Sequence, residues 1–185
     1  MSTVIPRFLP DVPFPPYSFV PDQHPHPQND PLGHSYGQKP EPVDAPDPTQ
    51  WLHCKEYLRG IDLFNHGYYW EAHEAWESLW HAYGRQGESA EFLKGLIQLA
   101  VAGVKIRQGL SEGVKTHARR AEELFNSLSI SRAVARRRFM GLDLVDLATR
   151  AREIAEKENV KHVPSNLPVA IVFPFTLRPD PSDFA

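Results

Sequence analysis

The sequence has little of what would mark a disulfide-bonded, membrane-spanning or strongly basic protein. Its one cysteine, Cys54, excludes an internal disulfide, which fits a reducing compartment without requiring one. No apolar run approaches the roughly 18–20 residues of a membrane-spanning helix, and the stretch MSTVIPRFLPDVPFPP lacks the apolar region of a secretory signal. A formal net charge of −3 disfavours electrostatic binding of nucleic acid. These absences predict a cytoplasmic protein without a membrane partner.

Proline is missing from the middle of the chain, and this gap gives the clearest boundary. All eighteen prolines lie at or before Pro48 or at or after Pro164. Because proline costs about 3 kcal/mol inside a helix, the gap predicts a helical domain between two extended arms. The predicted division is a proline-rich N-terminal arm over 1–48, a helical bundle over 49–160 and an extended tail over 161–185.

The proline-free middle predicts an all-α fold, a small antiparallel bundle of about four to six helices. Gly67, Gly84 and Gly109 follow helix-like segments and indicate helix ends. Such short, glycine-marked connections favour antiparallel neighbours, and no segment of the middle alternates like a strand. The predicted helices span about 48–65, 69–83, 89–108, 111–127, a shorter segment near 131–138, and 143–158.

Both arms are too rich in apolar side chains to be plain disordered segments. The tail contains the apolar run VAIVFPFTL. The N-terminal arm contains the rings of Phe8, Phe14, Tyr17, Phe19 and Tyr36. Each arm is therefore expected either to dock on the bundle or to bind a partner or a second copy of the chain, which leaves a homo-oligomer open.

The segment EAHEAWE, residues 71–77, crowds acidic and histidine side chains into the second predicted helix. A projection at about 100° per residue separates these side chains into two arcs. The core-facing arc holds Ala72, Ala75, Trp76, Leu79 and Trp80. The opposite arc, which is predicted to point away from the core, holds Glu71, Glu74, Ser78 and His81.

His73 and Glu77 are one helical turn apart at the edge of the apolar arc, with Trp70 beside them. An imidazole and a carboxylate at this spacing can hold one divalent ion or orient the imidazole for proton transfer. We therefore predict His73, Glu74 and Glu77 as catalytic residues, and His73 and Glu77 as metal ligands. The same pair also fits a structural hydrogen bond, and the spacing is not the H-E-x-x-H of zinc proteases.

The next two predicted helices also place polar groups near the core. Lys94 and Gln98 belong to a polar stripe on an otherwise apolar helix, and the stripe faces either solvent or a cleft shared with His73. A buried Gln needs a hydrogen-bond partner, for which His73 is a candidate. His117 falls within the apolar face of the following helix. The predicted ligand-binding residues are Trp70, Glu71, Lys94, Gln98 and His117.

A second histidine group lies in the N-terminal arm, in DQHPHPQNDPLGHS. His24, His26 and His34 would bind a transition metal or, alternatively, belong only to a polar, turn-rich loop. The run RAVARRR, residues 132–138, could meet phosphate or RNA but equally fits a solvated helix end. The sequence has no glycine-rich phosphate loop, nucleophile elbow or C-x-x-C pair.

Three stretches, FNHGYYWEAHEAWESLW, FLKGLIQLAVA and a following G-x-x-x-H-A, resemble the DUF309 family, a domain of unknown function, over roughly residues 56–128. The resemblance implies a small all-α bundle, found mostly in bacteria and archaea, with no established activity. Trp76 stands where the family pattern has Leu, which leaves the His and Glu pattern intact. The signature residues would be Phe64, Asn65, Gly67, Glu71, His73, Glu74, Glu77, Trp80, Gly95, Leu96, Gln98 and Ala100.

Two functions remain open at this point. The first is a polar pocket between the second, third and fourth helices that binds a divalent metal ion or a small polar ligand and performs metal-assisted or acid–base hydrolysis. Glu74 or Glu71 would act as the base, and the mechanism loses it if both face solvent. The alternative is a non-enzymatic interaction or structural module in which the cluster is a hydrogen-bond network. RNA association through residues 132–138 is a weaker third option.

Overall fold

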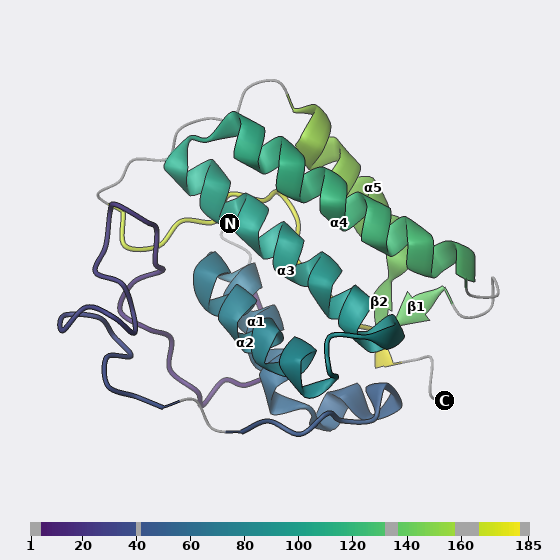
Figure 1. Cartoon of the computed structure of the whole chain (residues 1–185), viewed down its shortest axis with the longest axis horizontal. Coiled ribbons are helices and arrows are strands. Elements are labelled where there is room, and N and C mark those ends of the chain that lie inside the picture. The colour runs from purple at the N-terminus through teal and green to yellow at the C-terminus, as the bar shows by residue number, and fades with distance from the viewer. Residues whose placement is uncertain (1–4, 40–41, 132–136, 158–166, 182–185) are drawn as a thin grey trace.

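Helices dominate the residues that the computed structural model describes, namely 5–39, 42–131, 137–157 and 167–181. The elements are η1 (Pro48–His53), α1 (Lys55–Asn65), α2 (Tyr69–Ala82), α3 (Gly87–Gln108), α4 (Ser111–Ser131), β1 (Arg138–Phe139), β2 (Leu142–Asp143) and α5 (Leu144–Glu156). Consecutive α-helices pack antiparallel, and Figure 1 shows α3 and α4 side by side with α2 and α5 flanking them. The predicted all-α bundle is confirmed.

The first predicted helix is broken, because η1 and α1 are separated by an extended residue, Cys54. The Asp47 side chain caps η1 by accepting the Thr49 N–H at 2.8 Å. Trp51 on η1 is fully buried and meets Tyr57 of α1 edge to face. The break thus lies between two elements whose large aromatic side chains pack together in the core.

The prediction that the middle contains no strand is wrong at one short hairpin. In this hairpin β1 pairs antiparallel with β2, with Phe139 opposite Leu142. Met140 and Gly141 both have positive φ, as a tight two-residue hairpin turn requires. Most of the short helix predicted near 131–138 lies outside the described residues, and Arg138 belongs to β1 instead. Asp143 caps α5 as predicted.

The C-terminal tail completes the core between α1 and α2. Phe173 stacks on Phe64 with ring centroids 5.3 Å apart. The buried Asn65 side chain forms two hydrogen bonds with the backbone of Leu177, at 2.7 and 2.8 Å, in place of a strand partner. The tail is therefore held by both apolar contacts and directional hydrogen bonds.

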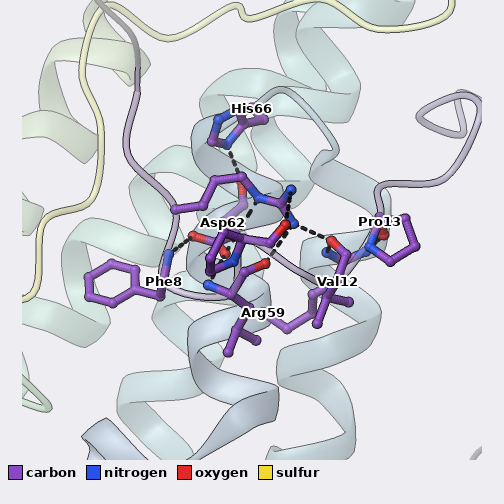
Figure 2. A network of polar contacts seen from close by, with 9 residues as sticks. Phe8, Val12, Pro13, Arg59, Asp62 and His66 are labelled. Atoms are coloured by element: carbon purple, nitrogen blue, oxygen red, sulfur yellow. Dashed lines mark hydrogen bonds and ion pairs between the residues drawn. The ribbon is translucent and has the colours of Figure 1, made fainter.

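The N-terminal arm crosses the outer face of α1 and α2. Asp62 of α1 is fully buried and its carboxylate accepts the backbone N–H groups of Phe8 and Leu9, both at 2.8 Å (Figure 2). Phe14 stacks on Tyr68 at 4.8 Å. Tyr36 is exposed. The arm is thus docked on the bundle through several of its rings and through backbone hydrogen bonds to α1.

Candidate functional site

The second α-helix presents the acid–histidine cluster at the edge of the core, as its periodicity predicts. Ala72, Trp76 and Leu79 are fully buried on the core side of α2. The side chains of His73 and Glu77 are 14% and 39% exposed. Both therefore lie between the apolar interior and solvent, where a polar site is accessible but partly shielded.

The side chains of His73, Glu74 and Glu77 lie close enough together to bind one metal ion. Their possible ligand atoms all fall within 4.8 Å of one another. Among the described residues, this is the one group of three His, Cys, Asp or Glu side chains close enough to share a metal ion. His73 Nδ1 is 3.4 Å from Glu74 Oε1, and His73 Nε2 is 3.7 Å from Glu77 Oε2. His73 Nδ1 is buried and makes no hydrogen bond with any described residue. The cluster thus has an unsatisfied nitrogen beside two carboxylates.

Glu74 contributes a partly buried carboxylate to this cluster. Burial raises the pKa of its carboxyl, and repulsion from Glu77 and Glu71 adds to the shift, while His73 and a hydrogen bond from Gln28 act in the opposite direction. The Gln28 Nε2 group of the arm donates to Glu74 Oε2 at 2.9 Å. The arm therefore holds this carboxylate in a partly buried position, with 33% of the side chain exposed.

Glu71, on the arc of α2 opposite the core, does not face solvent, because the N-terminal arm covers that face of the helix. Glu71 is 8% exposed. Its Oε1 accepts the Phe19 N–H at 2.9 Å and lies 3.1 Å from Nε2 of His34. Its Oε2 is buried and has no hydrogen-bond partner among the described residues. A helical projection places a residue relative to its own helix and carries no information about a distant segment laid over it.

Trp70 joins the cluster to the arm. Its ring centroid is 5.2 Å from that of His73, 4.9 Å from Phe19 and 5.7 Å from His26. Trp70 therefore lies beside the cluster as predicted, and it also packs against Phe19 and His26 of the arm.

The polar groups of α3 and α4 do not join this cluster through hydrogen bonds. Gln98 Oε1 lies 2.8 Å from Nδ1 of His117, so the partner proposed for Gln98, His73, is replaced by a residue of α4. Burial lowers the pKa of His117, and the charge of Lys105 lowers it further. Lys94 lies over the Trp80 ring at 4.3 Å, which gives its ammonium a cation–π contact.

The three arm histidines are placed separately in the described part of the chain, each against an aromatic ring. His24 stacks on Tyr17, and His26 packs against Phe19. His34 contacts Tyr17 edge on and reaches Glu71. They form no metal-binding trio there, although His34 contacts Glu71 and His26 packs against Trp70 on α2.

Of the predicted arginine run, residues 132–136 lie outside the described residues. Arg137 pairs with Asp143, and Arg138 pairs with Asp180.

Arg107 is a functional candidate that the sequence reasoning missed. This residue of the last turn of α3 is fully buried, and its Nη2 donates to the Leu167 carbonyl at 2.7 Å. Its Nε and Nη1 have no partner among the described residues. Burial and the Arg107 charge together lower the pKa of His24. A lone arginine near the end of an apolar helix was the available signal, but it resembles an ordinary helix-terminal cation.

These features define an antiparallel helical bundle whose second α-helix carries a partly buried acid–histidine cluster beneath a docked arm. Residues 57–116 match the family described as "Domain of unknown function (DUF309)", which confirms the resemblance. The matched segment runs from α1 through α2 and α3 into α4. No curated protein matches the chain. None of the helices in the described ranges is long and apolar enough to cross a membrane.

Proposed function

We propose that this protein binds one divalent metal ion through His73, Glu74 and Glu77. The observation that carries the proposal is the convergence of three ligand atoms within 4.8 Å around a buried, unpaired imidazole nitrogen. Ligands about 2.1 Å from an ion lie roughly 3.0–3.4 Å from one another, so rotamer shifts of about an ångström would close the set. One imidazole with two carboxylates suits Zn²⁺, Mn²⁺ or Fe²⁺ better than Ca²⁺.

The three donors come from a single helix and leave coordination positions for water or substrate. Such an incomplete protein ligand set is typical of catalytic rather than structural metal sites. Bound there, the ion would lower the pKa of a coordinated water. Metal-assisted hydrolysis is therefore the activity that this site would support, with His73 and Glu77 holding the ion and Glu74 acting as third ligand or base. Glu71, the other base considered, is not among the three residues whose ligand atoms converge.

A specific observation favours a second, structural function. The two ring nitrogens of His73 face different carboxylates, Glu74 on one side and Glu77 on the other. A protonated imidazole would satisfy both carboxylates at once without any metal. In that case the cluster stabilises α2 itself through ion pairs within the helix, and the protein acts as an interaction or structural module.

Metal binding separates these functions. The untagged protein, stripped with EDTA, is titrated with Zn²⁺ and with Mn²⁺ by calorimetry, and bound metal is counted by elemental analysis after dialysis. We expect one ion per chain in wild type and loss of that ion in His73→Ala and Glu77→Gln. His81→Ala is the matched control, since His81 lies on the exposed side of the same helix. A His24, His26 and His34 triple alanine variant tests the arm.

Equal metal binding by wild type and His73→Ala would contradict the proposed site. An absence of metal in all proteins, together with a lower melting temperature in His73→Ala, would support the structural function instead. Because Glu74 has a raised pKa, protons compete with the metal for it, and affinity is expected to fall as the pH drops.

A further inference from the structure

A cavity of about 220 Å³ lies between the N-terminal arm and the outer face of α1 and α2. The arm contributes Pro27, Gln28 and His34 to its wall. The bundle contributes Trp70, Glu71 and Glu74. Drug-sized ligand pockets span about 300–1,000 Å³, so this cavity suits a molecule of only a few carbon atoms.

The cavity wall carries more negative charge than its contacts compensate. Glu71 is nine-tenths buried, and its Oε2 has no hydrogen-bond partner among the described residues. Its ion-pair partner is His34, which carries charge only when protonated. Glu74 adds a second carboxylate, whose Oε2 is contacted at 2.9 Å by a neutral amide, Gln28 Nε2. A bound cation would compensate the charge of both carboxylates.

The guanidinium groups of Arg59 and Arg107 form hydrogen bonds elsewhere. Arg59 also lines the cavity, but its Nη1 and Nη2 donate to the carbonyls of Val12 and Pro13 at 3.1 and 2.6 Å (Figure 2). Arg107 directs its Nη2 to the Leu167 carbonyl and forms no ion pair with Glu71 within 4.0 Å. These two guanidinium groups therefore anchor the arm and the tail. Neither forms an ion pair with Glu71, whose partner His34 is charged only when protonated.

Trp70 supplies the remaining element of a cation site. Its indole lines the cavity next to both carboxylates. An aromatic face beside carboxylates attracts an organic ammonium through cation–π and ion-pair interactions together, and both strengthen when water is excluded. The prolines at the arm side, Pro15 and Pro27, give apolar surface to the aliphatic part of such a ligand.

We propose that this cavity binds a small organic primary ammonium, with Glu71 and Glu74 receiving the ammonium group and Trp70 covering it. The proposal does not depend on a metal bound to the neighbouring cluster, although Glu74 borders both sites. The predicted ligand class follows from a free carboxylate oxygen, a second carboxylate and an aromatic side chain that line one cavity.

The test is a calorimetric titration with butylammonium chloride in buffer containing EDTA, so that failure of the metal proposal leaves this result intact. Sodium butyrate and 1-butanol, of matched chain length, are titrated in parallel. We expect saturable binding of one butylammonium per chain and no saturable binding of the anion or the alcohol. Glu71→Gln keeps the shape and the acceptor for Phe19 N–H and should weaken butylammonium binding by at least about tenfold.

Glu74→Gln is the second variant, in case Glu71→Gln fails to fold, and the same weakening is expected. Glu91→Gln is the matched control, because Glu91 is exposed on α3 and outside the cavity wall. Wild-type affinity in both Glu71→Gln and Glu74→Gln would overturn the proposal. Equal binding of butanol and butylammonium, a preference for butyrate, or no saturable binding of butylammonium would overturn it as well.

Discussion

Removing the Asp62 carboxylate should detach the N-terminal arm from the bundle. Asp62 is fully buried and accepts the Phe8 and Leu9 N–H groups at 2.8 Å each (Figure 2). Its ion pair with Arg7 is longer, at 3.9 Å, and partly exposed. Hydrogen bonds to a charged acceptor contribute about 1.5–3 kcal/mol each, and an exposed ion pair about 0–1 kcal/mol. The sum for Asp62→Ala is a loss of about 3–7 kcal/mol if the arm stayed in place.

Arm release limits that loss, because water satisfies the two amides once the arm leaves. We therefore expect the free energy of unfolding to fall by about 3 kcal/mol, near the lower end of that range. The amides of Phe8 and Leu9 should exchange with solvent deuterium at least about a hundredfold faster, since each tenfold corresponds to about 1.4 kcal/mol. Urea unfolding measures the first quantity, and hydrogen exchange read by NMR measures the second.

Two comparisons make the result decisive. Asp62→Asn keeps one acceptor oxygen and should lose about half as much stability. Asp11→Asn, an exposed acidic residue of the same arm, should change the free energy of unfolding by less than about 0.5 kcal/mol. Unchanged exchange at Phe8 and Leu9 in Asp62→Ala would refute the conclusion that this carboxylate holds the arm.

Two further predictions concern packing and pH. A Cβ at Gly103 would lie 2.6 Å from the buried Tyr69 ring, so Gly103→Ala should lose about 1–3 kcal/mol in urea unfolding; Gly113→Ala, which meets only the flexible Lys105 side chain, is the control and should be neutral or stabilising. His117 has a lowered pKa when folded, so the unfolded chain takes up its proton first, and stability should be full above about pH 6.5 and decline below it. His117→Gln should flatten that decline in unfolding measured from pH 5 to 7.5, and an unchanged slope would contradict the assignment.

The helix pattern was predictable because it depends on local spacing. Proline absence and glycine stops gave the helices of the bundle, and the 3.6-residue period placed His73 and Glu77 correctly at the edge of the core. The break at Cys54 was not predictable from that period, because the period shows which face of a helix is buried and not where the helix is interrupted. The β1–β2 hairpin is too short to show a strand alternation in the sequence.

The contacts between helices were less predictable, because they depend on how each helix is rotated about its axis. Gln98 was expected to need a partner, and it has one, but the partner is His117 rather than His73. Both histidines are polar residues next to apolar positions, and spacing along the chain cannot choose between them. Spacing along the chain likewise could not predict the environment of Arg107, which donates a hydrogen bond to Leu167 of the distant tail.

The arm determines the chemistry of the candidate sites as much as the matched domain does. Residues 57–116 supply Glu71 and Glu74, while His34 and Gln28, which contact those carboxylates, lie outside the match. Without the arm, both carboxylates would face water, and burial would no longer raise the pKa of Glu74. A carboxylate that is well solvated has little reason to capture a cation, whereas a desolvated one gains free energy when it does. The family segment therefore carries the acidic groups, and the proline-rich arm supplies the shielding on which both proposed cation sites depend.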